Sequence, residues 1–297
     1  MIIDNSYDTG AAGTSPYSSP YSDGDSMPHS NDSQSYAANS QQPLTLAVDI
    51  GGSGLKAAVV DASGQMVTER ERIETPYPLD PQRLVDSLSL LASDLHTASG
   101  IGYDRVSVGF NGMVRHGIII TAPQFSTIGG LGTPVDDNLV QAWHNFDLAG
   151  ALERTLGKPT RVANDADVQG AAAVAGKGLE LVVTLGTGCG TAMFYNGSLL
   201  PHMEFAHHPL HGKETYNDYI GDHALRTLGS SRWTKRVMKT IDVMRNLMFF
   251  DKCYVGGGNA KKLTQKLPDD CAIVDNSAGI LGGVKLWDAG HLGITDS

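Results

Sequence analysis

An amide and two carboxylates follow a short predicted strand near the middle of the chain. Residues 160–163 read Thr-Arg-Val-Ala, and Asn164, Asp165 and Asp167 come directly after them. A segment rich in alanine and glycine, residues 169–178, follows. The pattern is typical of a strand that carries polar side chains to its end and then turns into a helix, where α/β proteins bind ligands. Our hypothesis is that Asp165 is a catalytic base, and a solvated strand end with an Asn/Asp helix cap is the alternative.

The chemistry that this pattern suggests is phosphoryl transfer to a hydroxyl group. Such a reaction needs a carboxylate that orients the hydroxyl and accepts its proton. In this interpretation Asp165 is the base and Asn164 fixes the geometry of a sugar hydroxyl. Asp167 is the competing candidate for the base, but a structural cap is the role that we prefer for it.

A first glycine turn lies between two apolar runs near residue 50. It contains Gly51, Gly52 and Ser53, with Asp49 before it and Lys56 after it. Glycine lets backbone N–H groups approach a phosphate without obstruction by side chains. Asp49 could hold Mg²⁺ through water, and Lys56 could add positive charge. An ordinary hairpin turn is the alternative. The dinucleotide-binding fingerprint is excluded, because a strand follows the turn where that fingerprint has a helix.

A second turn of the same kind contains Gly186, Thr187 and Gly188. Residues 46–64 and 181–197 repeat one unit of strand, glycine turn, strand and turn. Two copies of one unit suggest two similar lobes that face a cleft, and they favour phosphate binding over a plain hairpin in each.

A third glycine turn, Gly256-Gly257-Gly258, follows a predicted strand and precedes a predicted helix. The N-terminus of a helix favours a nucleotide or a phosphate. A tight turn without a ligand explains the same residues equally well.

Glu204 and His207 follow the second glycine turn and are three residues apart. Both side chains can face one ligand, and such a pair suits a cluster of sugar hydroxyls. A surface loop is the alternative, and it is the interpretation that we prefer for His208. A zinc site would need more ligands than this segment offers.

The spacing of apolar residues predicts alternating strands and helices. The clearest helix begins at Asp80-Pro81, where Asp suits the N-cap and Pro suits the first turn. Leucines at 84, 88, 91 and 95 form one face of it. Strands are expected at 44–50, 55–61, 65–70, 105–110, 116–122, 160–163, 180–185, 190–195, 198–200, 252–255 and 272–274, and further helices at 148–156, 215–228, 233–250, 258–267 and 277–287.

Composition narrows the class of protein. Residues 1–43 are rich in Ser, Asp, Asn and Gly and have no apolar period, so we expect a disordered tail that is not a signal peptide. The net charge of −10 argues against a general nucleic-acid binder. No apolar run reaches the ~18–20 residues that cross a bilayer, so we expect no membrane partner. The cysteines Cys189, Cys253 and Cys271 lack a metal-type spacing, which is typical of reduced thiols in a cytoplasmic protein.

Positive charge is concentrated in one segment despite the acidic total. Ten Lys or Arg residues lie between Arg226 and Lys266, against only Asp242 and Asp251. A polyanion many phosphates long needs a positive surface beyond the active site. The alternative is that these basic residues form the solvent-exposed face of an amphipathic helix.

Taken in order, these motifs resemble those of the ROK-family sugar kinases. The matching stretches are Asp49 to Gly54, Gly109-Phe110-Asn111-Gly112, Asn164-Asp165-Ala166, Gly186 to Gly190, Glu204 to His207 and Gly256 to Gly258. The resemblance spans roughly residues 44–288. It implies an α/β, actin-like, hexokinase-type ATPase fold with two lobes and a cleft, residues 44–165 and 166–297, with the closing C-terminal helix packed back on the first lobe.

The same resemblance implies roles for the residues. Asp165 would be the general base, and the hexose would be bound by Asn164, Glu204 and His207, with Asn111 nearby. The glycine turns would bind the phosphates of the donor with Mg²⁺, and the protein would be a homodimer.

One departure from the family pattern points to a branch of it. The Cys-rich zinc motif that usually follows the His is absent, so no zinc is expected. Together with the short segment between Glu204 and the third turn, this trait resembles the polyphosphate glucokinase branch, in which the donor is polyphosphate, sometimes with ATP. The expected function is phosphorylation of glucose to glucose 6-phosphate in the cytoplasm. The alternatives are an ATP-dependent glucokinase or mannokinase, and a sugar-responsive ROK regulator without catalysis.

Overall fold

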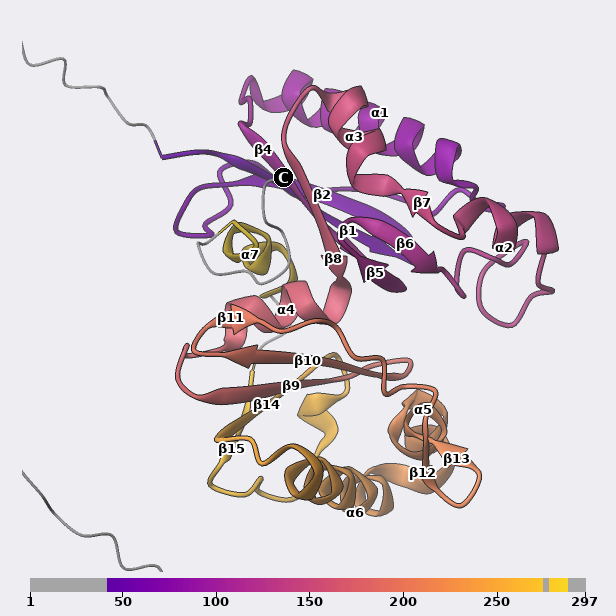
Figure 1. The fold of residues 1–297 in the computed structure, drawn as a ribbon, viewed down its shortest axis with the longest axis vertical. Coiled ribbons are helices and arrows are strands. Elements are labelled where there is room, and N and C mark those ends of the chain that lie inside the picture. The colour runs from indigo at the N-terminus through magenta and orange to yellow at the C-terminus, as the bar shows by residue number, and fades with distance from the viewer. Residues whose placement is uncertain (1–41, 275–277, 288–297) are drawn as a thin grey trace, which may run out of the picture. The chain divides into compact units, whose positions relative to one another are not determined.

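Two five-stranded sheets organise the described part of the chain (Figure 1). The computed structural model describes residues 42–274 and 278–287, all within one compact unit, Gln41–Ser297. The predicted tail therefore lies almost wholly outside the described residues. The division into lobes at residue 165 remains a prediction.

The first sheet has the strand order β3-β2-β1-β4-β8. Strand β1 pairs antiparallel with β2, whereas β4 pairs parallel with both β1 and β8. In register, Asp49 lies beside Gly109, and Gly109 lies beside Ala163. Because the carboxyl ends of parallel strands meet at one edge of a sheet, the polar residues after these three strands converge there. The strands are β1 (Thr45–Gly51), β2 (Gly54–Val60), β3 (Glu71–Ile73), β4 (Arg105–Phe110) and β8 (Thr160–Asn164).

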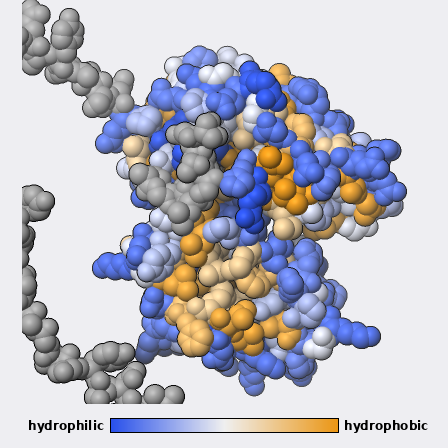
Figure 2. All heavy atoms as spheres, in the orientation of Figure 1, coloured by the Kyte–Doolittle hydropathy of each residue, from blue (hydrophilic) through white to orange (hydrophobic). Residues whose placement is uncertain are grey.

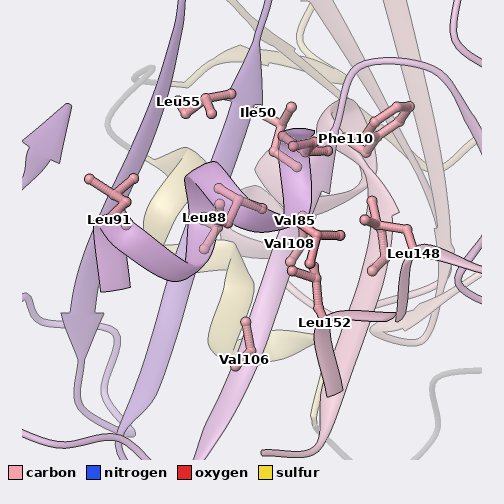
Figure 3. Packing of buried hydrophobic residues seen from close by; sticks show 14 of the residues in the cluster. Ile50, Leu55, Val85, Leu88, Leu91, Val106, Val108, Phe110, Leu148 and Leu152 are labelled. Atoms are coloured by element: carbon pink, nitrogen blue, oxygen red, sulfur yellow. The ribbon is translucent and has the colours of Figure 1, made fainter. Parts of the chain in front are cut away.

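Helices α1 (Pro81–Ser99) and α3 (Leu148–Leu156) cover one face of this sheet. Helix α1 begins at Asp80, whose side chain accepts a hydrogen bond from the backbone N–H of Arg83, and ends at Gly100, with φ of 70°. Its apolar face packs into the core shown in Figure 3, where Leu88 faces the sheet residue Val108. Burial of this apolar face of α1 stabilises the packing of the helix on the sheet, and thereby holds in place the sheet edge that carries the polar residues.

Several smaller elements pack beside the first sheet. Strands β5 (Met113–Arg115), β6 (Ile118–Thr121) and β7 (Phe146–Asp147) form a separate small sheet. Helix α2 (Asp137–Trp143) buries Trp143 against Phe110 and Phe125, and the indole N–H of Trp143 donates to the carbonyl of Leu79.

The second sheet has the strand order β11-β10-β9-β14-β15. A second core packs between this sheet and helices α5 and α6, around the fully buried Trp233. Helix α6 is kinked at Gly229, whose φ of 73° is not helical. The elements are β9 (Leu179–Leu185), β10 (Cys189–Tyr195), β11 (Ser198–Leu199), β12 (Pro209–His211), β13 (Glu214–Thr215), α5 (Tyr216–Ile220), α6 (Asp222–Met248), β14 (Lys252–Gly256), a 3₁₀ turn (Ala260–Lys262) and β15 (Cys271–Ile273).

Helix α4 (Asp165–Ala173) contacts both sheets. It packs against β4 and β8 of the first sheet and against β9 and β10 of the second, and it lies between them in Figure 1. Helix α7 (Ala278–Lys285) packs on α4 and on β1, β2 and β4. The candidate residues at the start of α4 are thus held by both halves of the described chain.

Several sequence expectations were wrong in detail. The strand expected at 65–70 is replaced by β3 at Glu71–Ile73, because the hydroxyl of Thr68 accepts from Val59 N–H and interrupts the ladder. The helix expected at 258–267 is only the 3₁₀ turn Ala260–Lys262. Helix α2 and the short strands β5, β7, β12 and β13 were not predicted.

The visible face of the molecule carries mostly hydrophilic residues, with hydrophobic ones gathered in patches (Figure 2). Among the residues that the structure describes, no helix combines the length and the apolar character needed to cross a membrane.

Candidate active site

Asn164 joins two of the predicted motifs. It is the last residue of β8 and the N-cap of α4, where its side-chain oxygen accepts from the N–H of Ala166 at 2.8 Å. Its side-chain amide donates to the carbonyl of Gly112, also at 2.8 Å. The turn that contains Asn111 and Gly112 is thereby tied to the start of α4. A buried Asn with both ends satisfied holds this geometry firmly.

Asp165 is the first residue of α4 and is partly buried. Burial raises the pKa of its carboxyl from 3.8 to about 7, and the negative charges of Asp49 and Asp167 add to this effect. A carboxyl that titrates near neutral pH is matched to accepting a proton from a hydroxyl. The effect of Asp49 also shows that the end of β1 lies close to Asp165.

Two glycines allow the start of α4 to approach both sheets. A Cβ on Gly109, in β4, would lie 3.6 Å from the Cα of Asp165. A Cβ on Gly190, in β10, would lie 3.1 Å from the Cβ of Ala166, tighter than ordinary packing. Asp165 therefore lies next to the Gly109–Gly112 turn on one side and next to the second glycine turn on the other.

The first glycine turn is held by side chains from outside it. Arg72 donates to the carbonyl of Ser53 at 2.7 Å, and a Cβ on Gly52 would collide with the side chain of Gln124. The ammonium of Lys56 lies 2.8 Å from the carboxylate of Asp49. The turn thus presents a carboxylate, a cation and a glycine backbone close together.

The carboxylate of Asp49 suits Mg²⁺ in one respect. In the described ranges no group of three or more His, Cys, Asp or Glu side chains is arranged to hold a metal ion. Mg²⁺ usually takes only one or two carboxylates and completes its shell with water and substrate phosphates. A single carboxylate beside a glycine turn, as Asp49 provides, fits a site of this kind.

The second and third glycine turns lie against each other. The side-chain amide of Asn259 donates to the carbonyl of Gly186 at 3.2 Å, and the N–H of Asn259 donates to the carbonyl of Leu185 at 2.9 Å. Gly257 has φ of 87°, and a Cβ there would collide with the backbone of Leu185. The helix that begins beside these turns is α6, because the N–H of Asp222 donates to the carbonyl of Thr187 at 3.2 Å. The 3₁₀ turn that follows Gly258 is too short to offer the helix N-terminus expected there.

Glu204 and His207 lie on the segment after β11. The carboxylate of Glu204 accepts from the N–H of Ala206 at 2.9 Å. The nearby side chain of His202 is the main cause that lowers the pKa of Glu204, and His207 adds to it. Burial raises the pKa of the Cys189 thiol to about 12, with a further contribution from Glu204. These interactions indicate that Glu204 lies close to His207 and to the start of β10. The side chain of His207 itself is exposed.

Asp167 does not cap a helix. The cap of α4 is Asn164, and Asp167 is 3% exposed inside the helix, with a carboxylate oxygen 3.0 Å from Nδ1 of His202. His202 was not singled out in the sequence, where it stands between Pro201 and Met203 without a recognisable motif. The structure thus replaces a predicted cap by a buried ion pair.

The basic segment is partly neutralised. Arg226, Arg236 and Arg245 pair with Asp222, Glu214 and Asp270. The exposed cations of this segment that have no acidic partner among the described residues are Arg232, Lys235, Lys239, Lys261 and Lys262. Helix α6 meets the segment after the 3₁₀ turn where the hydroxyl of Thr234 accepts from the N–H of Thr264 at 3.1 Å.

Comparison with known proteins gives a consistent picture. A model of the ROK family matches residues 45–210. A polyphosphate glucokinase of Mycobacterium tuberculosis is 29% identical over 252 residues, which cover 79% of this chain and 88% of the relative. A polyphosphate glucokinase of Mycobacterium leprae is 30% identical over 251 residues, which cover 79% and 72%.

A solved structure agrees with the sequence matches. The crystal structure of an inorganic polyphosphate/ATP-glucomannokinase from Arthrobacter sp. strain KM has a TM-score of 0.68 and 28% identity, and it covers 82% of this chain and 97% of that one. These likenesses confirm the fold class expected from the sequence, the α/β, actin-like fold of hexokinase-type ATPases.

Proposed function

The chain belongs to the ROK family, and on that premise we propose that it is a glucokinase that transfers a phosphoryl group to the 6-hydroxyl of glucose, with polyphosphate as the donor. The observation that carries the proposal is Asp165. Its carboxyl has a pKa raised to about 7; Asp165 lies beside Gly109 of β4, and the next residue, Ala166, lies beside Gly190 of β10.

Asp165 accepts the proton of the sugar hydroxyl. The hydroxyl oxygen attacks the terminal phosphorus of the donor, and the bond between that phosphorus and its bridging oxygen breaks. The products are glucose 6-phosphate and a polyphosphate shorter by one unit. The proton remains on Asp165 until it leaves to solvent, which a pKa near neutral allows.

The sugar lies on one side of Asp165 and the donor on the other. Asn164, Glu204 and His207 bind the hydroxyls of the hexose, and Asn111 borders them through the link from Asn164 to Gly112. Placing several hydroxyls at once fixes the reacting one in line with the donor.

The donor phosphates are bound by the three glycine turns. Gly51, Gly52 and Ser53 supply backbone N–H groups on one side, and Lys56 supplies charge. The second and third turns, which the contacts of Asn259 hold together, supply the other side through Gly186, Thr187, Gly188 and Gly256–Gly258. Asp49 would hold Mg²⁺ through water, and the ion would neutralise charge on the transferred group.

Polyphosphate is the donor that two lines of observation support. The Mycobacterium relatives are polyphosphate glucokinases. In addition, Arg232, Lys235 and Lys239 lie on α6, and Lys261 and Lys262 lie just after the third turn. Exposed cations without acidic partners suit a long polyanion that extends beyond the active site. ATP as donor and mannose as acceptor form the second candidate, which the name of the Arthrobacter enzyme favours.

We also propose the state of the protein in the cell. Two lobes, 44–165 and 166–297, close over the substrates and exclude water, which would otherwise be phosphorylated. The chain acts as a cytoplasmic homodimer, and its three free, buried cysteines suit a reducing compartment. Light scattering after size exclusion tests the dimer.

The deciding experiment is a glucose phosphorylation assay with polyphosphate or ATP at matched Mg²⁺. We expect glucose 6-phosphate with polyphosphate, and a higher kcat/KM with polyphosphate than with ATP. Turnover with ATP alone would refute the choice of donor, and binding of glucose without turnover by any donor would favour a sugar-responsive regulator instead.

A further inference from the structure

His202 lies between two carboxylates that belong to different parts of the fold. Its Nδ1 is 3.0 Å from Oδ1 of Asp167 on α4, and its Nε2 is 3.8 Å from Oε2 of Glu204. The side chains of His202 and Asp167 are 6% and 4% exposed, whereas that of Glu204 is 24% exposed. The imidazole therefore connects a buried carboxylate to one that reaches the surface of the candidate sugar site.

The Nε2 atom of His202 is buried without a hydrogen-bond partner, and no other side-chain N or O in the described ranges shares that condition. An orphaned buried donor costs about 1–3 kcal/mol, so such a group calls for an explanation. The nearest carboxylate oxygen, on Glu204, lies just outside hydrogen-bond range. A small rotation of the partly exposed Glu204 would close the contact.

The charge on His202 makes that contact favourable. Burial alone lowers the pKa of His202, but the hydrogen bond to Asp167 and the pairing with Glu204 outweigh it and raise the pKa to about 10. Both ring nitrogens of His202 therefore carry a proton at neutral pH, so neither of them can accept a hydrogen bond. Both carboxylates face the same cation.

The backbone around His202 is anchored as well. The hydroxyl of Thr191, on β10, donates to the carbonyl of Met203 at 3.1 Å. Asp167 is two residues from Asp165 on the same helix. A displacement of His202 would therefore be felt both at the start of α4 and along the segment that carries Glu204.

We infer that His202 is a positioning residue for the hexose: it is fixed by Asp167 and aims its free Nε2–H at Glu204, so that the Glu204 carboxylate is held at a set distance from Asp165 when the sugar binds. The inference rests on the proposed function, since it assigns Glu204 to the sugar. The sugar itself does not reach His202, because Nε2 is buried.

The test compares His202→Gln with wild type in the phosphorylation assay. Glutamine keeps a donor for Asp167 but cannot carry the charge. We expect KM for glucose to rise about tenfold or more, with kcat and the KM for polyphosphate changed less than about threefold. His96→Gln, at the exposed last turn of α1, is the matched control and should leave all three values unchanged.

A double-mutant cycle separates positioning from general packing. If His202 acts through Glu204, then His202→Gln should add little to the KM of Glu204→Gln, because the group that it positions has already lost its charge. Additive effects in the cycle, or an unchanged KM in His202→Gln, would overturn the inference.

A second variant tests the same inference in case His202→Gln does not fold. Asp167→Asn keeps the shape of the side chain but removes the anion that fixes His202, and it should raise the KM for glucose in the same way. Titration calorimetry with glucose alone gives the affinity without turnover. A wild-type protein that binds glucose but phosphorylates it with neither donor would contradict the proposed function, whereas active wild type with unchanged affinity in both variants would contradict only the role of His202.

Discussion

Asp165→Asn tests the electrostatic argument for the base in two independent ways. In the folded chain the carboxyl of Asp165 stays protonated up to about pH 7, whereas in the unfolded chain it ionises near 3.8. Between these values the folded state binds more protons than the unfolded state, so the contribution of Asp165 to the free energy of unfolding falls as pH rises from about 4 to 7. Asparagine cannot ionise and escapes this loss.

The magnitude follows from the two pKa values. Going from 3.8 to about 7 corresponds to ~4 kcal/mol at pH well above 7. At pH 5 about 1.5–2 kcal/mol of this is already lost, so the difference in unfolding free energy between Asp165→Asn and wild type should grow by ~2–3 kcal/mol from pH 5 to pH 8. The prediction concerns only this increase with pH, because an effect of the amide that does not depend on pH is the same at every pH and cancels.

The assay is urea unfolding of both proteins at pH 5, 6, 7 and 8, without donor or Mg²⁺. Asp86→Asn, exposed on α1, is the control and should follow wild type at every pH. A difference between Asp165→Asn and wild type that stays flat across this range would refute the claim that burial raises the pKa of Asp165.

The same variant should lose kcat by ~10²–10⁴-fold while it binds glucose nearly as wild type does. Wild-type activity should rise with pH through about 7, because the base must be ionised. Retained turnover in Asp165→Asn would move the base to Asp167 or elsewhere.

Three further experiments test other parts of the structure. Gly257→Ala places a Cβ against the backbone of Leu185 at a φ of 87° and should lower the free energy of unfolding by more than ~1 kcal/mol. Gly258→Ala is the control: it has open space around it and should change the free energy of unfolding by less than ~0.5 kcal/mol. Equal effects of the two variants in urea unfolding would contradict the packing of the third turn. The double substitution of Lys235 and Lys239 to Glu should raise KM for long-chain polyphosphate several-fold and leave KM for ATP unchanged; a similar rise for ATP would argue against a polyphosphate surface on α6. Asn164→Ala removes the cap of α4 and the bond to Gly112, so it should cost ~1–2 kcal/mol by thermal unfolding and lower kcat, and full activity would mean that neither contact positions Asp165.

The sequence was most informative where chemistry follows a strand. Asp49 lies two residues before the end of β1, Asn111 directly follows β4, and Asn164 ends β8. The parallel register of these strands brings their ends together. Helix α1 was predicted to the residue at its start, since Asp80-Pro81 is a local signal that tertiary packing did not override.

What the sequence could not predict depends on contacts between distant residues. His202 and Asp167 are 35 residues apart and belong to no periodic pattern, so neither the buried pair nor its charge could be foreseen. Counting the cations of the basic segment did not reveal which ones are neutralised, because Glu214 and Asp270, the partners of Arg236 and Arg245, lie outside the most basic stretch of helix α6. The helix expected after Gly258 is cut short where Thr264 bonds to Thr234.

The last described helix sets the order in which the protein can be completed during its synthesis. Helix α7 covers Ala47, Ala58 and Val60 of the first sheet with Val284, and the hydroxyl of Ser107 donates at 2.6 Å to the carbonyl of Gly283, 176 residues further along. A nascent chain therefore carries an open apolar face on its first sheet until helix α7 has been synthesised. A stalled or truncated chain keeps that face exposed and is expected to become a substrate for chaperones and proteases.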